Sequence, residues 1–418
     1  MSALALRISR RTFRSLRRHR NYRLFFSGQV VSLIGTWMQN IALAWLVIEL
    51  SGSALAIGAL AFCRFLPFLL FGLVAGVVVD RFDSRRLLVV TQGVAMIVSA
   101  ALAVVTLAGV ATLPVVYALA LLGGVILVVD APARQTLTYQ MVGPAELQNA
   151  VALNSGLFNG SRVIGPAIAG LLIAVVGTGL CFVINAFSFL AVLASLRLLR
   201  TDELTPVVRH DTRVIAGIRE GIAWARHAPL ARTVLVVVTI VSLAGFNFHV
   251  LVPLLASETL DVGAETFGIL SAGFGLGALA GALVAASFRE ASPKAFVGGG
   301  VGFSLMMLGL SLVESVPAAL ALLFVLGISF SLFTSSANVL LQLAAPDHLR
   351  GRVISLYLFA FAGLAPIGGL VAGWLAEQGG TALAFGVAGV AGLCASAWAV
   401  RELAVARPRA ARADASPV

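Results

Sequence analysis

Residues 76–86 read Gly76-Val-Val-Val-Asp80-Arg81-Phe82-Asp83-Ser84-Arg85-Arg86, a short charged stretch between two long apolar runs. The runs cover residues 54–79 and 87–109. A helix needs about 20 predominantly apolar residues to cross the hydrocarbon core of a bilayer, and each run is long enough. The sequence therefore predicts a tight loop that joins two transmembrane helices.

The same alternation of apolar runs and short polar loops continues along the 418 residues. Hydrophobic residues make up 60% and charged residues 11% of the chain, against about 25% charged in a soluble domain. The runs are continuous rather than alternating, which excludes the strands of a β-barrel. We predict an all-α membrane protein with twelve transmembrane helices in two pseudo-symmetric six-helix bundles. The predicted spans are 24–49, 54–79, 87–109, 114–136, 148–176, 178–199, 231–256, 266–288, 295–314, 317–343, 351–376 and 380–400.

Positive charge is concentrated in the loops of one side, and the net charge is +11. Arg and Lys occur near both termini and in the central loop, whereas the opposite loops hold Glu258, Asp261, Glu265, Glu314 and Glu377 without Arg or Lys. Cytoplasmic loops carry this excess of basic residues. We therefore predict a bacterial inner-membrane protein with both termini in the cytoplasm. The charge reflects topology, so a nucleic-acid partner is not expected.

The predicted organisation has five parts. A basic cytoplasmic arm covers 1–22, the first bundle 23–199, a cytoplasmic linker 200–230, the second bundle 231–401 and a cytoplasmic tail 402–418. Within the linker, apolar and basic residues alternate with helical spacing from Asp211 to Arg226. This pattern is typical of a helix on the membrane surface, and a solvated linker helix is the alternative.

The opening stretch resembles the signature loop of the major facilitator superfamily. Gly76, Asp80, Arg81 and Arg85 fit that pattern, while Asp83 stands in the place of a glycine. The resemblance implies a loop that latches one half of a transporter against the other in the outward-facing state. Physically, Gly76 allows close helix contact, and Asp80 can cap the turn and pair with an Arg.

Residues 130–170 resemble one exporter subfamily of that superfamily, which includes enterobactin exporters and macrolide-efflux proteins. Asp130-Ala-Pro-Ala-Arg134-Gln135 carries the resemblance, together with Gly165, Pro166 and Gly170 on the fifth helix. The last three are also similar to the helix-5 motif of drug–proton antiporters and imply a conformational gate. The resemblance implies efflux of a siderophore or a drug-like molecule.

Asp130 is a carboxylate clearly inside an apolar run. A charge at bilayer depth costs at least about 2.5–3.5 kcal/mol, so it needs a partner or a water-filled cavity. One hypothesis is that Asp130 exchanges a proton as the cavity changes sides. The alternative is a conformational latch, in which Asp130 pairs with Arg134 one turn away or with Arg85.

Two intramembrane arginines, Arg64 and Arg162, leave the first half with a net positive set of charges. A positive cavity suits an anionic or phenolate-bearing substrate. The alternative for Arg162 is a structural tie to backbone carbonyls or to Asp130. His249 is a third candidate because its charge can change near neutral pH, although a satisfied polar group is the plainer interpretation.

Four amides lie in the first and tenth helices, which face the cavity in the superfamily that the sequence resembles. They are Gln39, Asn40, Asn338 and Gln342. Amides at these positions can hydrogen-bond a substrate, or they can bond across helices and stabilise packing.

The function predicted from these features is secondary active transport, with proton-coupled export of a small amphipathic molecule. Catalytic constellations, metal-ligand spacings and phosphate loops are not expected from the sequence, so no cofactor and no enzyme activity are predicted. The partners expected are a small-molecule substrate, the proton and the lipid bilayer, with the chain acting as a monomer. An importer or lipid-moving facilitator of the same fold is one alternative, and a non-transporting membrane sensor or scaffold is another.

Overall fold

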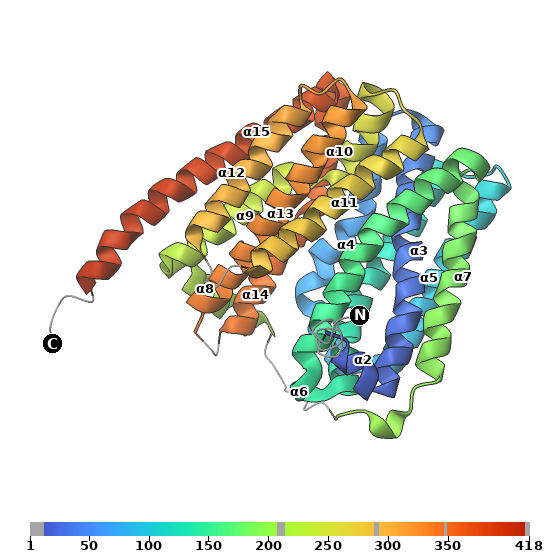
Figure 1. Ribbon diagram of the computed structural model, residues 1–418, viewed down its shortest axis with the longest axis horizontal. Coiled ribbons are helices and arrows are strands. Elements are labelled where there is room, and N and C mark those ends of the chain that lie inside the picture. Colours follow the sequence, from blue (N-terminus) through green and yellow to red (C-terminus); the bar gives the residue numbers. More distant parts are fainter. Residues whose placement is uncertain (1–11, 207–213, 288–291, 347–348, 414–418) are drawn as a thin grey trace, which may run out of the picture.

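The computed structural model describes residues 12–206, 214–287, 292–346 and 349–413, and the regular elements in these ranges are helical (Figure 1). The elements are α2 (Arg14–Arg18), α3 (Arg20–Ser51), α4 (Ala54–Asp80), α5 (Ser84–Leu107), α6 (Leu113–Val176), α7 (Thr178–Arg197), the 3-10 turn η1 (Thr201–Glu203), α8 (Val214–His227), α9 (Pro229–Gly245), α10 (Phe248–Leu254), the π-helical turn η2 (Leu255–Thr259), α11 (Ala264–Ser287), α12 (Pro293–Leu310), α13 (Val316–Ala344), α14 (Arg350–Leu358), the π-helical turn η3 (Phe359–Gly363) and α15 (Ala365–Ala413).

Two of the helical elements contain a chain reversal. The backbone leaves helical geometry at Gly143 in α6 (φ 67°) and at Gly380 in α15 (φ 69°), left-handed values that favour glycine. As an unbroken helix, the 64 residues of α6 would be about 95 Å long, far more than the roughly 30 Å of a bilayer core. The described residues contain ten candidate spans, and splitting these two gives the twelve predicted crossings.

The helices form two bundles (Figure 1). In the first bundle α3 packs on α6 and α7, and α5 packs on α6 and α7. In the second, α13 packs on α11 and α12, and α15 packs on α9 and α12. The bundles meet along two helix pairs, α6 with α11 and α4 with α15. The all-α fold with two bundles, predicted from the sequence, is confirmed.

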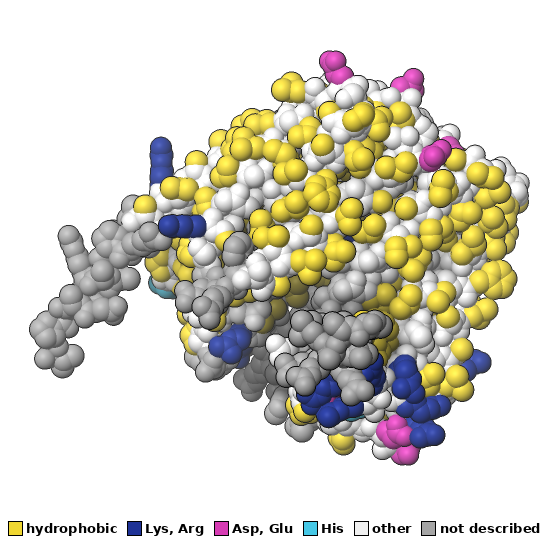
Figure 2. All heavy atoms as spheres, in the orientation of Figure 1, with side chains coloured by type: hydrophobic (Ala, Val, Ile, Leu, Met, Phe, Trp, Pro, Cys, Tyr) yellow, Lys and Arg dark blue, Asp and Glu magenta, His cyan; other side chains and the backbone are white. Residues whose placement is uncertain are grey.

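The molecule has a hydrophobic band between two polar ends (Figure 2). Lys and Arg side chains gather at the end that holds α2 and α8, which we call the termini side (Figures 1 and 2). The opposite end, called the distal side, carries exposed acidic side chains. These are Glu258, Asp261, Glu265, Glu314 and Glu377. Because a bilayer solvates the apolar band and water the two ends, the chain spans a membrane several times.

Glycines bring the bundles into backbone contact toward the distal side. A β-carbon on Gly373 of α15 would lie 2.9 Å from the α-carbon of Gly58 in α4. Likewise, a β-carbon on Gly268 of α11 would lie 2.8 Å from the α-carbon of Gly170 in α6. Small residues at helix crossings allow this approach in membranes. These two helix–helix contacts have the same arrangement, which agrees with pseudo-symmetric halves.

Two of the twelve crossings are interrupted. In the seventh, α9 ends at Gly245 and α10 begins at Phe248, with Phe246 and Asn247 outside helical geometry. The Asn247 side chain donates to the backbone oxygen of Leu243 over 3.0 Å, which satisfies a carbonyl near the break. In the eleventh, η3 separates α14 from α15. Interrupted helices commonly form the central site of transporters.

The short helix α2 docks at the turn between the two crossings of α6. Ser15 is fully buried, and its backbone N–H donates to Oδ1 of Asn149 over 3.0 Å. The buried carboxylate of Glu146 accepts from Arg14 Nε at 2.6 Å and from Arg18 Nη1 at 3.0 Å. Both arginines are partly exposed, so this cluster is a solvent-edged ionic contact. The part of the predicted basic arm before residue 12 lies outside the described residues.

The predicted linker helix is present as α8. It packs against α9 and α14, and Trp224 contacts the hydrophobic core. Glu220 forms an ion pair with Arg352 at the start of α14. Residues 207–213 of the predicted linker lie outside the described residues, and contact of α8 with the membrane surface remains a prediction.

Candidate substrate-binding site

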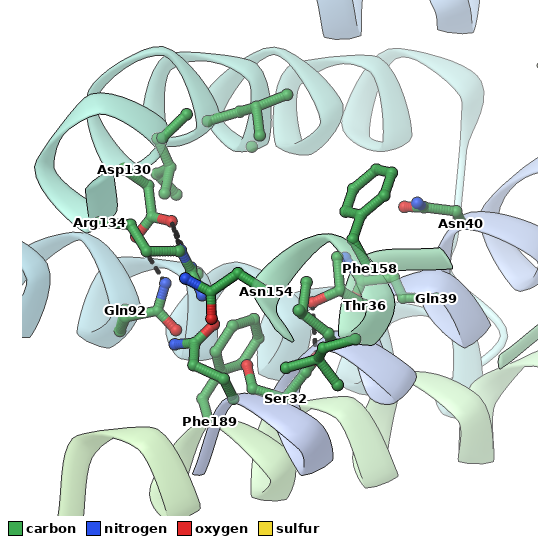
Figure 3. Close-up of a pocket in the computed structure, with 18 of the residues that line it drawn as sticks. Ser32, Thr36, Gln39, Asn40, Gln92, Asp130, Arg134, Asn154, Phe158 and Phe189 are labelled. Carbon is green, nitrogen blue, oxygen red and sulfur yellow. Dashed lines mark hydrogen bonds and ion pairs between the residues drawn. The ribbon is translucent and has the colours of Figure 1, made fainter. Parts of the chain in front are cut away.

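A cavity of about 950 Å³ lies within the first bundle, among α3, α4, α5, α6 and α7 (Figure 3). Its wall is largely apolar, with Phe25, Phe158 and Phe189 among the lining residues. Five residues predicted from the sequence line it, namely Gln39, Asn40, Arg64, Asp130 and Arg134. An apolar cavity with a few converging polar groups is typical of a small-molecule site.

Asp130 is fully engaged at the wall of this cavity (Figure 3). Its Oδ1 accepts from Thr91 Oγ1 at 2.9 Å and from Gln92 Nε2 at 2.6 Å. Its Oδ2 accepts from Arg134 Nε at 3.1 Å and also contacts Arg134 Nη2. The pair with Arg134 was one of the sequence-based alternatives. Thr91 and Gln92 come from α5, so Asp130 ties the third and fourth crossings together.

The four predicted amides have different surroundings. Gln39 Oε1 accepts from Ser99 Oγ at 2.6 Å and from Asn185 Nδ2 at 2.7 Å, so it joins α3, α5 and α7. Asn40 lines the cavity and is separate from the Asp130 group in Figure 3. Asn338 and Gln342 bond to each other over 2.6 Å along α13. They are not among the residues that line the 950 Å³ cavity, and substrate contact by these two remains a prediction.

Arg162 connects the two bundles through aromatic rings. Its guanidinium carbon lies 4.4 Å from the ring centre of Phe274 and 5.4 Å from that of Phe330, both in the second bundle. It also lies 5.7 Å from the ring of Trp37 in α3. These distances fall within the range of cation–π attraction. The ring contacts stabilise the cation without neutralising it.

Arg64 and His249 meet at a second aromatic ring between the bundles. The Arg64 guanidinium carbon lies 5.7 Å from the ring centre of Phe65, and the His249 ring centre lies 5.0 Å from the same ring. His249 is exposed although it lies within a crossing, and it is within electrostatic range of Arg64 and Arg162. Three basic side chains therefore converge where the bundles meet. Within the described parts of the chain, no ion pair joins a carboxylate to Arg64 or Arg162.

The loop at residues 81–86 is organised by the residue that departs from the superfamily pattern. Asp83 caps α5, since its Oδ1 accepts from the backbone N–H of Arg86 over 2.8 Å. Arg85 donates from Nε to the backbone oxygen of Leu196 over 2.7 Å and so caps the end of α7. Its described partner is therefore α7, and not Asp130 as in one of the sequence-based alternatives. Arg81 is exposed. Gly76 and Asp80 belong to α4, but their side-chain positions lie outside the described residues.

The predicted helix-5 gate lies at contacts within and between bundles. A β-carbon on Gly165 would lie 2.5 Å from Trp37 Cβ, inside the first bundle. The backbone oxygen of Pro166 approaches Gly268 of α11, and Gly170 forms the crossing described above. A role for these residues in gating stays a prediction.

Some residues of the site region were not predicted. Gln29 and Gln92 line the cavity and are buried, with 4% and 3% exposure. Their polar character inside apolar runs was the available signal. At the distal side, Glu377 Oε2 accepts from Ser53 Oγ and from the backbone N–H of Leu55, both at 3.1 Å, and so caps α4 from the other bundle. No sequence signal links these distant positions.

Comparison with solved structures supports this architecture. A mutant of the nucleoside transporter NupG matches with a TM-score of 0.74 at 13% identity and covers 91% of this chain and 99% of that one. A bacterial homologue of the iron transporter ferroportin in its inward-facing state matches with a TM-score of 0.71 at 16% identity, over 92% and 98% of the two chains. Two bundles, interrupted crossings and a cavity in the first bundle thus give this chain the fold of these two membrane proteins.

The sequence comparisons specify the family. The family model described as "transmembrane secretion effector" matches residues 12–417, and the chain belongs to this family of the major facilitator superfamily. The staphyloferrin A transporter of Staphylococcus aureus is 27% identical, over 88% of this chain and 93% of the relative. The multidrug efflux pump Tap of Mycolicibacterium fortuitum is 27% identical over 83% and 87%. Macrolide efflux protein A of Streptococcus pyogenes is 25% identical over 91% and 96%.

Proposed function

We propose that this chain is a secondary transporter that exports a small amphipathic anion, a siderophore or a drug-like compound, by alternating access. The observation that carries the proposal is the cluster of Arg64, Arg162 and His249 between the bundles. Two of these groups are guanidinium cations faced by aromatic rings and without a described carboxylate partner. A cation inside a membrane crossing needs a partner or a water-filled cavity, and an anionic group of the substrate would supply the partner.

The arrangement of Arg162 also supports a role in the transport cycle. Its backbone belongs to α6, while the nearest rings, Phe274 and Phe330, belong to the second bundle. When the bundles rock apart on one side, these contacts must change. A substrate anion that binds Arg162 would compete with the rings or stack beside them, so binding and the relative position of the bundles would be linked.

We place the termini side in the cytoplasm, because it carries the basic residues of the chain. In this proposal residues 23–199 and 231–401 are the two bundles that move against each other. Residues 200–230 are the linker, and residues 402–418 are the tail. The membrane is then the bacterial inner membrane, and the working unit is the monomer. In this orientation the glycine crossings close the periplasmic side, as expected of an inward-facing transporter.

Proton coupling is proposed at Asp130, which would have to leave Arg134, Thr91 and Gln92 to exchange a proton. The four contacts of this carboxylate favour the latch hypothesis for the state described here. For an anion, the membrane potential also assists export, by about 2.3 kcal/mol per charge for each 100 mV. Export is favoured over import by the efflux function in the names of two relatives.

The proposal can be tested in a deletion strain complemented with wild type, Arg162→Leu or Arg162→Lys. Metabolites secreted with and without iron are compared, and insertion is checked by the amount of protein in the membrane. We expect a compound to disappear from the medium of the deletion strain, accumulate in its cells and return with wild type. Arg162→Leu should restore insertion but less than about a tenth of export, and Arg162→Lys an intermediate level.

Everted membrane vesicles then test whether the proton gradient drives transport. Uptake of the identified compound into vesicles should fall when a protonophore is added. Normal export by well-inserted Arg162→Leu would remove the proposed role of this cation. Identical media from both strains under both conditions would contradict export of a native metabolite and favour efflux of foreign drugs or import.

A further inference from the structure

The cavity of the first bundle contains buried polar atoms that no described group satisfies. They are Nε2 and Oε1 of Gln29, Oε1 of Gln92 and Nη1 of Arg134. A buried polar group without a partner costs about 1–3 kcal/mol, and native proteins contain few such groups. All three residues line the same cavity, which makes a ligand the natural partner.

The chemistry of Gln92 fixes which of its atoms is free. Its Nε2 lies 2.6 Å from Oδ1 of Asp130, and a carboxylate oxygen bonded in this way needs a donor. The nitrogen therefore faces Asp130, and the oxygen remains as an acceptor. Arg134 is held in the same way, because two of its nitrogens contact Asp130 and the third remains as a donor.

Gln29 lies at the same depth as this group. Gln39 of α3 bonds to Ser99 of α5, and both helices run from the termini side toward the distal side. Gln29 is ten residues before Gln39, and Gln92 is seven before Ser99. At about 1.5 Å per residue, the levels of Gln29 and Gln92 along the bundle axis differ by only about 4.5 Å.

The group offers both donors and acceptors and has no net charge, because Asp130 balances Arg134. This differs from the cationic end of the same cavity at Arg64. A β-carbon on Gly124 of α6 would touch the backbone oxygen of Arg64, and Gly124 precedes Asp130 by six residues, or about 9 Å along the helix. The cavity thus has a cationic level and, nearer the termini side, a neutral polar level.

We propose that Gln29, Gln92 and Arg134 bind an uncharged hydrogen-bonding group, a hydroxyl or a carboxamide, of the transported molecule. The ligand class is an amphipathic anion whose anionic group and neutral polar group are separated by an apolar segment. That the ligand is the transported substrate rests on the proposed function. The three residues line the cavity while their unpaired atoms are shielded in this state, and the terminal torsion of a glutamine is broad enough to turn them toward a ligand.

Two fluorescent probes test the site in the purified full-length protein. Nα-dansyl-Nε-acetyl-lysine carries a carboxylate, an aromatic group and a distant carboxamide. Nα-dansyl-2-aminononanoate carries the first two groups and an apolar chain of similar length. The wild type should bind the acetyl-lysine probe about tenfold more tightly, because a site built for hydrogen bonds discriminates against a ligand that lacks them.

Gln29→Leu and Gln92→Leu should reduce this preference to near unity and leave the affinity for the aminononanoate probe unchanged. Gln148→Leu, an exposed glutamine on the same α6 helix, should retain the wild-type preference. Gln29→Met and Gln92→Met serve if the leucine variants are not monodisperse. Equal binding of the two probes by wild type, absence of binding of both, or a preference that persists in the glutamine variants would each overturn the site.

A fourth variant separates this site from the proposed function. Arg64→Met should weaken both probes to a similar extent and preserve their ratio. If Arg64→Met weakens neither probe while the glutamine variants abolish the preference, the neutral site stands and the anion role of Arg64 fails. If Arg64→Met weakens both probes and the glutamine variants change nothing, the neutral site fails and the anion role stands.

Discussion

A β-carbon added to Gly58 would lie 3.1 Å from the α-carbon of Gly373 in the other bundle. At the second crossing, a β-carbon on Gly170 would lie 3.0 Å from the α-carbon of Gly268. A helix-start carbonyl also lies at each contact: that of Ala54 is 2.8 Å from a β-carbon added to Gly373, and that of Ala264 is 2.8 Å from one added to Gly170. The two bundles are thus joined at the distal side by backbone surfaces that leave no space for a side chain.

A leucine at Gly373 should therefore prevent closure of the distal side. We expect Gly373→Leu to reduce transport at least about tenfold and to increase the labelling of a cysteine at Ser257 by a membrane-impermeant thiol reagent. The control is Gly93→Leu, since in the described part of the chain no atom beyond the local helix backbone lies within 4 Å of a β-carbon at Gly93. Wild-type labelling of the Gly373→Leu protein would show that the crossing does not close this side.

Removal of the Glu377 carboxylate should loosen the start of α4. The cap joins Glu377 of one bundle to Ser53 and Leu55 of the other, and loss of a cap costs about 0.5–2 kcal/mol. We expect Glu377→Ala to speed amide hydrogen exchange at residues 54–58 about tenfold. Glu314→Ala removes an exposed acid of the same side and should leave that exchange unchanged; equal exchange in both variants would contradict the contact.

Substitution of Asp130 should destabilise the first bundle through Arg134. Asp130→Asn leaves a partly buried guanidinium without its counter-charge, at an expected cost of about 1–3 kcal/mol. Thermal unfolding in detergent should show this loss, and the double variant Asp130→Asn with Arg134→Gln should recover part of it. Additive losses in the double variant would show that the two side chains are not coupled.

Asp83 supplies a test of the loop that resembles the superfamily signature. Asp83→Ala removes the N-cap of α5 and should cost about 1 kcal/mol, whereas Asp83→Gly should cost only a few tenths. Glycine is the residue that the superfamily pattern places here. Thermal unfolding of the three proteins measures both differences, and an alanine variant as stable as wild type would exclude the cap as a source of stability.

The twelve crossings were predictable because a bilayer requires long apolar runs and places basic residues on one side. The pair of Asp130 with Arg134 was also accessible, since residues four apart lie on one helix face. The bonds from Thr91 and Gln92 were not, because they depend on how α5 is rotated against α6. The break at Phe246 and Asn247 lies inside one predicted span, 231–256, and the ring contacts around it depend on tertiary packing. Phe246 contacts five other phenylalanine rings there.

The docking of α2 has a consequence for the order of biosynthesis. Ser15 bonds to the backbone oxygen of Glu146, a residue 131 positions later in the chain. When Ser15 leaves the ribosome its binding site does not yet exist, and it forms only after four crossings have been inserted and the chain has turned at Gly143. The segment that contains Ser15 therefore stays undocked while the first four crossings are synthesised and inserted. Its docking marks the moment at which the fourth and fifth crossings have reached their final positions.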